Sequence, residues 1–306
     1  MKRLLLAYDD SECSRTALTE TIRAGLPATM EVMVLSVADI WMPGDGSLEG
    51  DDENALPDNV RKARARGREH IKAHGQLASQ AGAELKKQFP SWNIQSVAST
   101  GSPAFTIVDK AREWQADLIV LGSHGRGPLR SFLLGSVTQV VATNASCSVH
   151  ITRPGSHSTH LPPIIAIAVD GSPDSQKIVH SVLDRNWPKG TFFQLLTVLD
   201  SRHETADSRP TLYASEWTQR HDVGVMDCLC RLIEHLSTQI ADRGWEVETH
   251  IVEGDPKKLI LEKVEQWNVG CLVLGAHGLE HGEQRLLGST ATALLTRAHC
   301  AVEIVR

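Results

Sequence analysis

Glycines and hydroxyl residues recur in a spacing that can bind phosphate. Gly122 and Gly125 stand three positions apart, and Gly135 follows after nine further residues, directly before Ser136. Glycine allows positive φ angles and a close approach of the backbone to a ligand, and the N–H groups at a helix N-terminus attract anions. The Ser136 and Thr138 hydroxyls can cap such a helix or bond an oxyanion. We therefore predict a phosphate-binding loop that leads into a helix.

The same pattern occurs twice in the chain. Leu121–Gly125 matches Leu274–Gly278, and Leu133–Ser136 matches Leu286–Ser289, both at an offset of 153 residues. An Asp-x-Ser sequence closes the first apolar run of each copy, at an offset of 161 residues. A self-similarity at a fixed offset indicates an internal repeat. We place the eight-residue difference between the two offsets in the loop after the second strand of the first copy.

Apolar runs that alternate with helical segments must position these loops. In the first copy the runs predict strands at Leu4–Tyr8, Glu31–Val37, Ile94–Ser99, Leu118–Leu121 and Val149–Thr152. In the second copy they predict strands at Ile164–Val169, Phe192–Val198, Trp245–Val252, Cys271–Leu274 and Ala301–Val305. Such alternation indicates parallel sheets built from right-handed crossovers. We expect an α/β fold of two tandem doubly wound, Rossmann-like domains, each with a five-stranded parallel sheet flanked by helices.

The length and composition of the chain fit two globular domains. A chain of 306 residues with 41% hydrophobic and 22% charged residues can build two cores of ordinary size. We place the first domain at residues 1–153, a linker rich in Pro, Ser, His and Gly at 154–163, and the second domain at 164–306. The acidic segment 44–54 is expected to be an exposed insertion before a long helix that starts near Asp58. It is not expected to bind calcium, because Leu56 stands where an EF-hand loop needs glutamate.

Charge and cysteine usage exclude several classes of function. A formal net charge of -6 argues against a surface for long nucleic acids, and the short apolar run after Met1 fits neither a signal peptide nor a membrane span. The six cysteines show no CxxC pairs, so we expect reduced thiols and no zinc ribbon. We predict a cytoplasmic protein that binds no nucleic acid, no membrane and no structural metal.

The glycine pattern, the Asp-x-Ser turn and a Gly-x-Pro helix start resemble the ATP-binding branch of the universal stress protein family, in its tandem form. By this resemblance Asp9 and Val37 would contact adenine, and the ribose and phosphates would lie against Gly122, Gly125, Arg126, Gly127, Gly135, Ser136, Val137 and Thr138. In the second copy the matching positions are Asp170, Val198, Gly275, Gly278, Gly288 and Ser289. The resemblance implies ATP as the ligand and leaves open whether Mg²⁺ accompanies it. Asp10 departs from the family, which usually has glycine there.

The two copies differ in charge around the predicted phosphate site. Between the loop glycines and the helix start, the first copy carries Arg126 and Arg130, whereas the second carries Glu280, Glu283 and Arg285. A unit charge about 4 Å from a phosphate changes the interaction by about 1 kcal/mol in bulk water and by more near a protein surface. We therefore expect ATP to prefer the first copy, with the second weak or empty.

Other motifs have simpler explanations. His277–His281 spells H-x-x-E-H, but the repeat places it in the glycine loop, where it cannot present both histidines on one helix face as zinc requires. His124 and His277 are expected to orient their loops by hydrogen bonding. Cys228 and Cys230 lie in a predicted helix, where residues two apart point to different faces, so we expect a buried apolar role for them and no metal site. The basic run Arg61–Arg68 is expected to be a solvated helix face.

Three functions remain open. The first is a nucleotide-dependent regulator of the stress response, and the second is an enzyme that adenylates a substrate. The sequence has no P-loop, no GxGxxG after the first strand and no GxSxG elbow, so we expect no enzyme beyond slow ATP hydrolysis. The third is a scaffold for proteins or apolar ligands with vestigial nucleotide sites. By the family resemblance, Val149–Thr152 and Ala301–Val305 would pair within the chain as a pseudo-dimer. The sequence leaves open a further homodimer and identifies no protein partner.

Overall fold

One ten-stranded sheet organises the chain, in the order β3-β2-β1-β4-β5-β10-β9-β6-β7-β8. The computed structural model describes residues 1–40, 57–125, 134–154, 163–172, 174–199, 225–278 and 287–306. The first five strands are β1 (Arg3–Ala7), β2 (Glu31–Ala38), β3 (Asn93–Thr100), β4 (Leu118–Gly122) and β5 (Ser148–Thr152). The second five are β6 (Ile164–Ala168), β7 (Phe192–Leu199), β8 (Glu246–Glu253), β9 (Cys271–Gly275) and β10 (Ala301–Val305). The pairs within each set of five are all parallel, which confirms the predicted fold class of two α/β domains.

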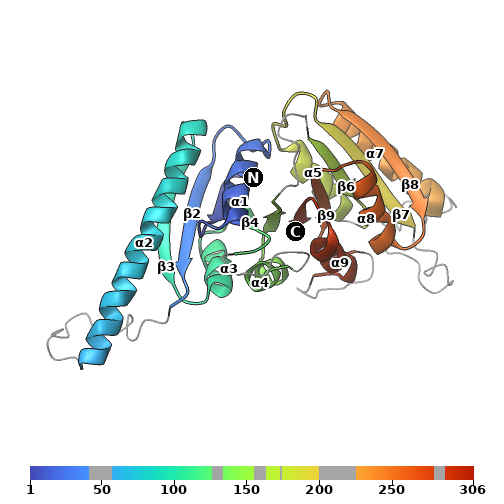
Figure 1. The fold of residues 1–306 in the computed structure, drawn as a ribbon. Coiled ribbons are helices and arrows are strands. Elements are labelled where there is room, and N and C mark those ends of the chain that lie inside the picture. Colours follow the sequence, from blue (N-terminus) through green and yellow to red (C-terminus); the bar gives the residue numbers. More distant parts are fainter. Residues whose placement is uncertain (41–56, 126–133, 155–162, 173, 200–224, 279–286) are drawn as a thin grey trace.

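Helices cover both faces of the sheet (Figure 1). In domain 1, the half that contains β1 to β5, they are α1 (Glu12–Arg23), α2 (Asp58–Gln88), α3 (Pro103–Glu113) and α4 (Ser136–Asn144). In domain 2, the half that contains β6 to β10, they are α5 (Asp174–Leu183), α7 (Val225–Ala241), α8 (Pro256–Gln266) and α9 (Ser289–Arg297). As predicted, a proline opens both α3 and α8, where its missing N–H has no intrahelical partner to lose. Among the described residues, no helix is long and apolar enough to cross a membrane.

The second helix of each domain differs most between the copies. We expected the extra residues of the first copy in the loop after β2. Residues 41–56 and 200–224, which follow β2 and β7, lie outside the described part of the chain, so this stays a prediction. In the described part, α2 has 31 residues and its counterpart α7 has 17. The N-terminal turns of α2 extend beyond the end of the sheet in Figure 1. The predicted insertion at 44–54 and most of the predicted linker at 154–163 lie outside the described residues.

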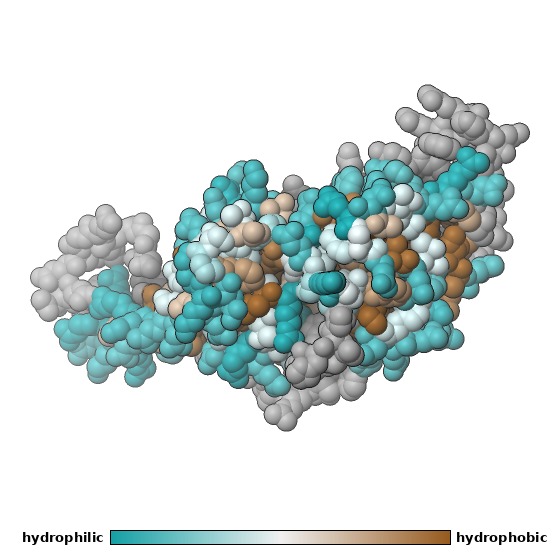
Figure 2. Space-filling view, turned by 90° about the horizontal axis from the view of Figure 1, so that it is seen from above, coloured by the Kyte–Doolittle hydropathy of each residue, from teal (hydrophilic) through white to brown (hydrophobic). Residues whose placement is uncertain are grey.

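The core is continuous across the two domains on one face of the sheet. There Ile107 and Val141, from α3 and α4, belong to the same cluster of buried residues as Ile260 and Leu294, from α8 and α9. On the other face each domain has a separate core. The surface seen from above is mostly hydrophilic in Figure 2, with scattered apolar areas. Phe105 is the one large hydrophobic side chain that is exposed in the described part of the chain.

The two domains join through their last strands. β5 and β10 pair antiparallel, with His150 opposite Glu303, as the resemblance had led us to expect for a pseudo-dimer. His150 Nδ1 lies 2.9 Å from a carboxylate oxygen of Glu303, and His150 Nε2 lies 3.6 Å from Glu20 on α1. Arg185, which follows α5, binds the other carboxylate oxygen of Glu303. All four side chains are buried, so the junction contains a network of charged groups shielded from water.

This network makes the free energy of unfolding depend on pH in two ranges. Burial alone lowers the pKa of His150, but Cys271 on β9, Glu20 and Glu303 raise it well above its usual value. Burial alone raises the pKa of Glu303, but Arg185 and His150 lower it to about 2. A raised histidine pKa stabilises the fold fully below about pH 6.5, and the effect is lost as pH rises through the folded-state pKa. A lowered carboxyl pKa stabilises it above about pH 4.3, and the effect is lost as pH falls toward the folded-state pKa.

We therefore expect a stability maximum in mildly acidic solution, with a decline on the alkaline side that His150 causes. Urea unfolding over a pH series would measure both limbs of the curve. In His150→Gln the alkaline decline should shrink, whereas the acid limb from Glu303 should persist. An unchanged alkaline limb in this variant would contradict the assignment to His150.

Candidate functional site

The candidate site of domain 1 lies where the carboxyl ends of β1 and β4 meet. β1 pairs with β2 on one side and with β4 on the other, so the strand order reverses at this point. Ligands of doubly wound folds bind in the crevice outside the strand ends at such a reversal. β6 and β9 repeat the arrangement in domain 2. The topology thus brings the Asp-x-Ser turn and the glycine loop of each copy to one end of the sheet.

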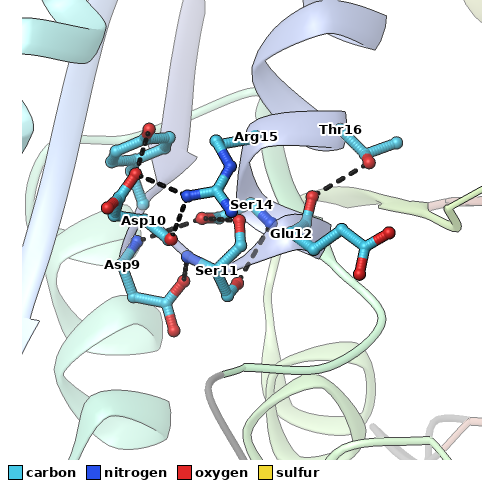
Figure 3. Close-up of polar contacts among 8 residues, drawn as sticks. Asp9, Asp10, Ser11, Glu12, Ser14, Arg15 and Thr16 are labelled. Carbon is cyan, nitrogen blue, oxygen red and sulfur yellow. Dashed lines mark hydrogen bonds and ion pairs between the residues drawn. The ribbon is translucent and has the colours of Figure 1, made fainter. Parts of the chain in front are cut away.

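Asp9 is held in a tight turn at the start of α1 (Figure 3). Its carboxylate accepts a hydrogen bond of 3.0 Å from the Ser11 backbone N–H, and the Ser11 hydroxyl caps α1 by accepting one of 3.2 Å from the Ser14 N–H. In domain 2 Asp170 accepts an equivalent bond of 3.0 Å from the Ser172 N–H. Each aspartate uses one carboxylate oxygen to fix the turn, and the other points toward the glycine loop.

Asp10 keeps the turn in the shape that glycine gives it in domain 2. Its φ angle is 61°, and that of the matching Gly171 is 80°. Aspartate adopts this left-handed region more readily than most residues. The Tyr8 hydroxyl donates to the Asp10 carboxylate at 3.1 Å, and Arg15 donates to its backbone carbonyl at 2.6 Å and its carboxylate at 2.9 Å. Burial and the bond to Asp10 raise the pKa of Tyr8 to about 12. Sequence reasoning missed the contacts of Asp10 with Tyr8 and Arg15.

The glycine loop returns to the aspartate in both domains. A Cβ atom at Gly125 would lie 3.1 Å from Asp9 Oδ2, and one at Gly278 would lie 2.7 Å from Asp170 Oδ2. A side chain at either position would therefore press against the carboxylate. The structure brings together these two predicted site residues of each copy, which stand more than a hundred positions apart in the sequence.

The two ends of the loop are joined at the start of the next helix. The Gly135 N–H donates to the Ser123 carbonyl at 2.9 Å, and the Gly288 N–H donates to the Ala276 carbonyl at 2.8 Å. Gly135 and Gly288 are the N-cap residues of α4 and α9, and no described side chain caps either helix. The first N–H groups of a helix that has no side-chain cap can bind an anion.

The predicted hydroxyls have different roles. Thr138 is buried, and its hydroxyl donates to the Gly122 carbonyl at 2.8 Å, which ties α4 to the end of β4. Ser136 and its counterpart Ser289 are exposed in the first turn of their helices. Ser136 is therefore the hydroxyl near the helix start that can meet a ligand. In domain 2 the position of Thr138 is occupied by the buried Ala291, so this link has no hydroxyl there.

The apolar residues of the predicted site lie at the strand ends and beside the helix start. Val37, at the end of β2, is 9% exposed and belongs to the core of domain 1. Val198, near the end of β7, and Val137, in the first turn of α4, are partly buried and pack against the same core. Val37 and Val198 can thus offer only a small apolar surface to a base, while most of each side chain supports the sheet.

One of the two loop histidines, His124, has a hydrogen-bond contact among the described residues. His124 Nδ1 lies 3.1 Å from the Ser123 hydroxyl, and Ser123 lies 3.9 Å from the sulfur of Cys13. Burial and the nearby Arg153 lower the pKa of His124, so it is a neutral imidazole near pH 7. The Nε2 atoms of His124 and His277 are buried without a hydrogen-bond partner in the described part of the chain.

The charges expected to distinguish the two sites lie outside the described residues. They belong to Arg126, Arg130, Glu280, Glu283 and Arg285, and the predicted site residue Gly127 lies outside the described residues as well. The preference of ATP for the first copy therefore stays a prediction. Among the described residues, no group of three or more His, Cys, Asp or Glu side chains could hold a metal ion.

The chain is similar to known proteins over its whole length. The model of the universal stress protein family matches residues 1–153 and residues 163–306. A universal stress protein of Mycobacterium tuberculosis is 26% identical over 252 residues, which cover 78% of this chain and 77% of the relative. A crystal structure of a universal stress protein from Archaeoglobus fulgidus has a TM-score of 0.59 and 21% identity, and the match covers 99% of this chain and 96% of that chain. A universal stress protein solved in complex with cAMP has a TM-score of 0.34 and 20% identity, and covers 47% of this chain and 97% of that chain.

Proposed function

The chain belongs to the universal stress protein family, with two tandem domains, and from this premise we propose that it is an ATP-binding regulator of the stress response in the cytoplasm. Domain 1 carries the better nucleotide site. The protein is not an enzyme, apart from slow hydrolysis of bound ATP. The occupancy of the site changes the shape of the paired domains or their choice of partner.

One observation carries the proposal. In domain 1 the second carboxylate oxygen of Asp9, the Gly125 backbone and the start of α4, which no described side chain caps, lie at the same reversal of strand order. The Asp9 oxygen can accept a hydrogen bond from a ribose or a base, and the start of α4 offers N–H groups for phosphate. The exposed Ser136 adds a hydroxyl beside those N–H groups. The positive charges of Arg126 and Arg130 in the sequence favour phosphate binding at this site over that of domain 2.

The test is a calorimetric titration of the full chain with Mg-ATP, in wild type and in the variants Gly135→Arg and Gly288→Arg. Each arginine would place a long side chain in front of the first N–H groups of its helix. We expect Gly135→Arg to lose most of the binding and Gly288→Arg to retain it. cAMP, which is bound in the crystal structure of another universal stress protein, serves as a second probe.

Controls separate binding from folding. A Cβ at Gly135 would lie 3.0 Å from the Ser123 carbonyl oxygen, and one at Gly288 would lie 3.2 Å from the Ala276 carbonyl oxygen. The alanine variants at both positions carry this crowding without blocking the site, so they should still bind. If the wild type binds neither ATP nor cAMP, the regulator proposal is wrong, and a scaffold with vestigial nucleotide sites becomes the better account.

A further inference from the structure

The junction of the two domains has an approximate two-fold axis that passes through His150 and Glu303. The two residues occupy equivalent positions of the repeat and stand directly opposite each other in the β5–β10 ladder. On either side of the axis, Val302 faces Ile151 and Ile304 faces Val149. Val149 is equivalent to Val302 and Ile151 to Ile304, so each strand places its valine opposite the isoleucine of the other. An isologous dimer interface has the same symmetry.

The apolar residues on either side of the axis are alike in the two halves. Val149 and Ile151 of β5 recur as Val302 and Ile304 of β10. The arginines that follow the two strands also make equivalent contacts. Arg153 donates to the carbonyl of Leu295 on α9, and Arg306 donates at 2.6 Å to the carbonyl of Ala142, the matching residue of α4. These contacts would fit two identical domains as well as two different ones.

The residues on the axis are the exception. One half contributes an imidazole and the other a carboxylate, and the outer partners are also unlike. Glu20 has Ser181 as its counterpart in domain 2, and Arg185 has Ala24 as its counterpart in domain 1, at the offset of 161. Across the junction the charges alternate in the order Glu20, His150, Glu303, Arg185. Each domain supplies one acid and one base, so only the pairing of unlike domains completes the series.

The burial of this network gives it discriminating power. Glu20 and His150 are each 5% exposed, Arg185 is 2% exposed and Glu303 is 0% exposed. A pairing of β10 with a second β10 would bring two Glu303 carboxylates together in this buried position. A pairing of β5 with a second β5 would bring two His150 imidazoles together, each beside its own Glu20. Like charges out of contact with water repel strongly, and interfaces use such repulsion to reject wrong partners.

We infer that the network of Glu20, His150, Arg185 and Glu303 selects the partner of each last strand. β5 is built to accept a β10 edge, which carries a carboxylate on the axis and an arginine beside it, and to reject a second β5. The partner that fits is domain 2, from the same chain or from a second copy that exchanges domains. This selectivity is a property of the junction and does not depend on nucleotide binding.

The test uses two full-length variants, His150→Glu and Glu303→His. Within either variant the axis holds two like residues, so neither should form dimers on its own. When the two variants are mixed, the β10 edge of the first and the β5 edge of the second restore one native pair. After the mixture is warmed and cooled, native mass spectrometry with one chain isotope-labelled should detect a heterodimer. A mixture of wild type with either variant is the control. It should remain monomeric, because His150 and Glu303 of the wild type already pair within one chain.

Thermal unfolding of the same proteins provides a second readout. Each single variant should unfold at a midpoint on the order of 10 °C below wild type, since it breaks a buried pair in a domain of this size. The double variant His150→Glu/Glu303→His should not recover the midpoint. The introduced glutamate would face Glu20 and the introduced histidine would face Arg185, so the alternation of charges would be lost. Wild-type midpoints in both single variants, or no heterodimer in the mixture of folded variants, would overturn the inference.

Discussion

Replacing Gly122 with alanine is expected to lower the free energy of unfolding by about 1–3 kcal/mol or more. Gly122 ends β4 where α1 crosses it, and a Cβ atom there would lie 2.5 Å from Cys13 Cβ and 2.6 Å from the Cys13 carbonyl carbon. Backbone cannot move aside as a flexible side chain can, so α1 would have to shift away from the sheet. That shift would also displace the Asp9 turn. Urea unfolding measures the stability, and Mg-ATP titration of the folded variant measures the accompanying loss of affinity.

The repeat supplies a matched control for this variant. Gly275 is the equivalent glycine of domain 2, and a Cβ there would lie 3.1 Å from the His277 carbonyl oxygen and 3.4 Å from Ile178 Cδ1. Gly275→Ala should therefore destabilise less than Gly122→Ala. A second control is Gly75→Ala in α2, where the nearest atom is 3.9 Å away. Alanine should stabilise that helix by about 0.5–1 kcal/mol. Equal effects of the alanine variants at Gly122 and Gly275 would contradict the packing argument.

Removing Arg185 should destabilise the protein by about 3–5 kcal/mol, because a buried charge would lose its partner. In Arg185→Met the Glu303 carboxylate, which is 0% exposed, would keep His150 as its remaining charged partner among the described residues. Arg15→Met is the control, since the ion pair of Arg15 with Asp10 is largely exposed, with side-chain exposures of 56% and 44%. Exposed ion pairs contribute about 0–1 kcal/mol, so this control should change little.

The two variants are compared by urea unfolding at neutral pH. The midpoint of Arg185→Met should fall well below that of Arg15→Met. The pKa of Glu303, which Arg185 helps to lower, should rise in the variant. As pH falls, the free energy of unfolding of Arg185→Met should then begin to decrease at a higher pH than that of wild type. Similar midpoints for the two variants would show that the junction tolerates a Glu303 carboxylate without Arg185.

The fold could be read from the sequence because its signals are local or repeated. The predicted strands agree with the observed ones to within one residue at each end, since each is a short apolar run bounded by turn residues. The repeat of the glycine loop fixed the correspondence between the halves. A long helix that starts near Asp58 was also predicted, and α2 begins at Asp58.

The positions of the candidate site could be predicted from the sequence, but the hydrogen-bond partners of its side chains could not. The sequence brought Asp9 and the glycine loop to the same end of the sheet through the parallel topology. It did not show that the Thr138 hydroxyl binds Gly122, because that bond depends on how α4 packs. Nor did it single out Glu20 and Arg185, because their counterparts in the repeat, Ser181 and Ala24, are uncharged. A comparison of the two last strands would have given a signal for the axis, where His150 and Glu303 differ between otherwise matching valines and isoleucines.

The central claim is that domain 1 holds an adenine nucleotide, and the most direct measurement is mass spectrometry of the small molecules released on denaturing protein purified without added nucleotide. The account predicts about one ATP per chain. The nucleotide should be absent from Gly135→Arg and present in Gly288→Arg. Release of no nucleotide from wild type, together with no binding when Mg-ATP is added, would contradict it.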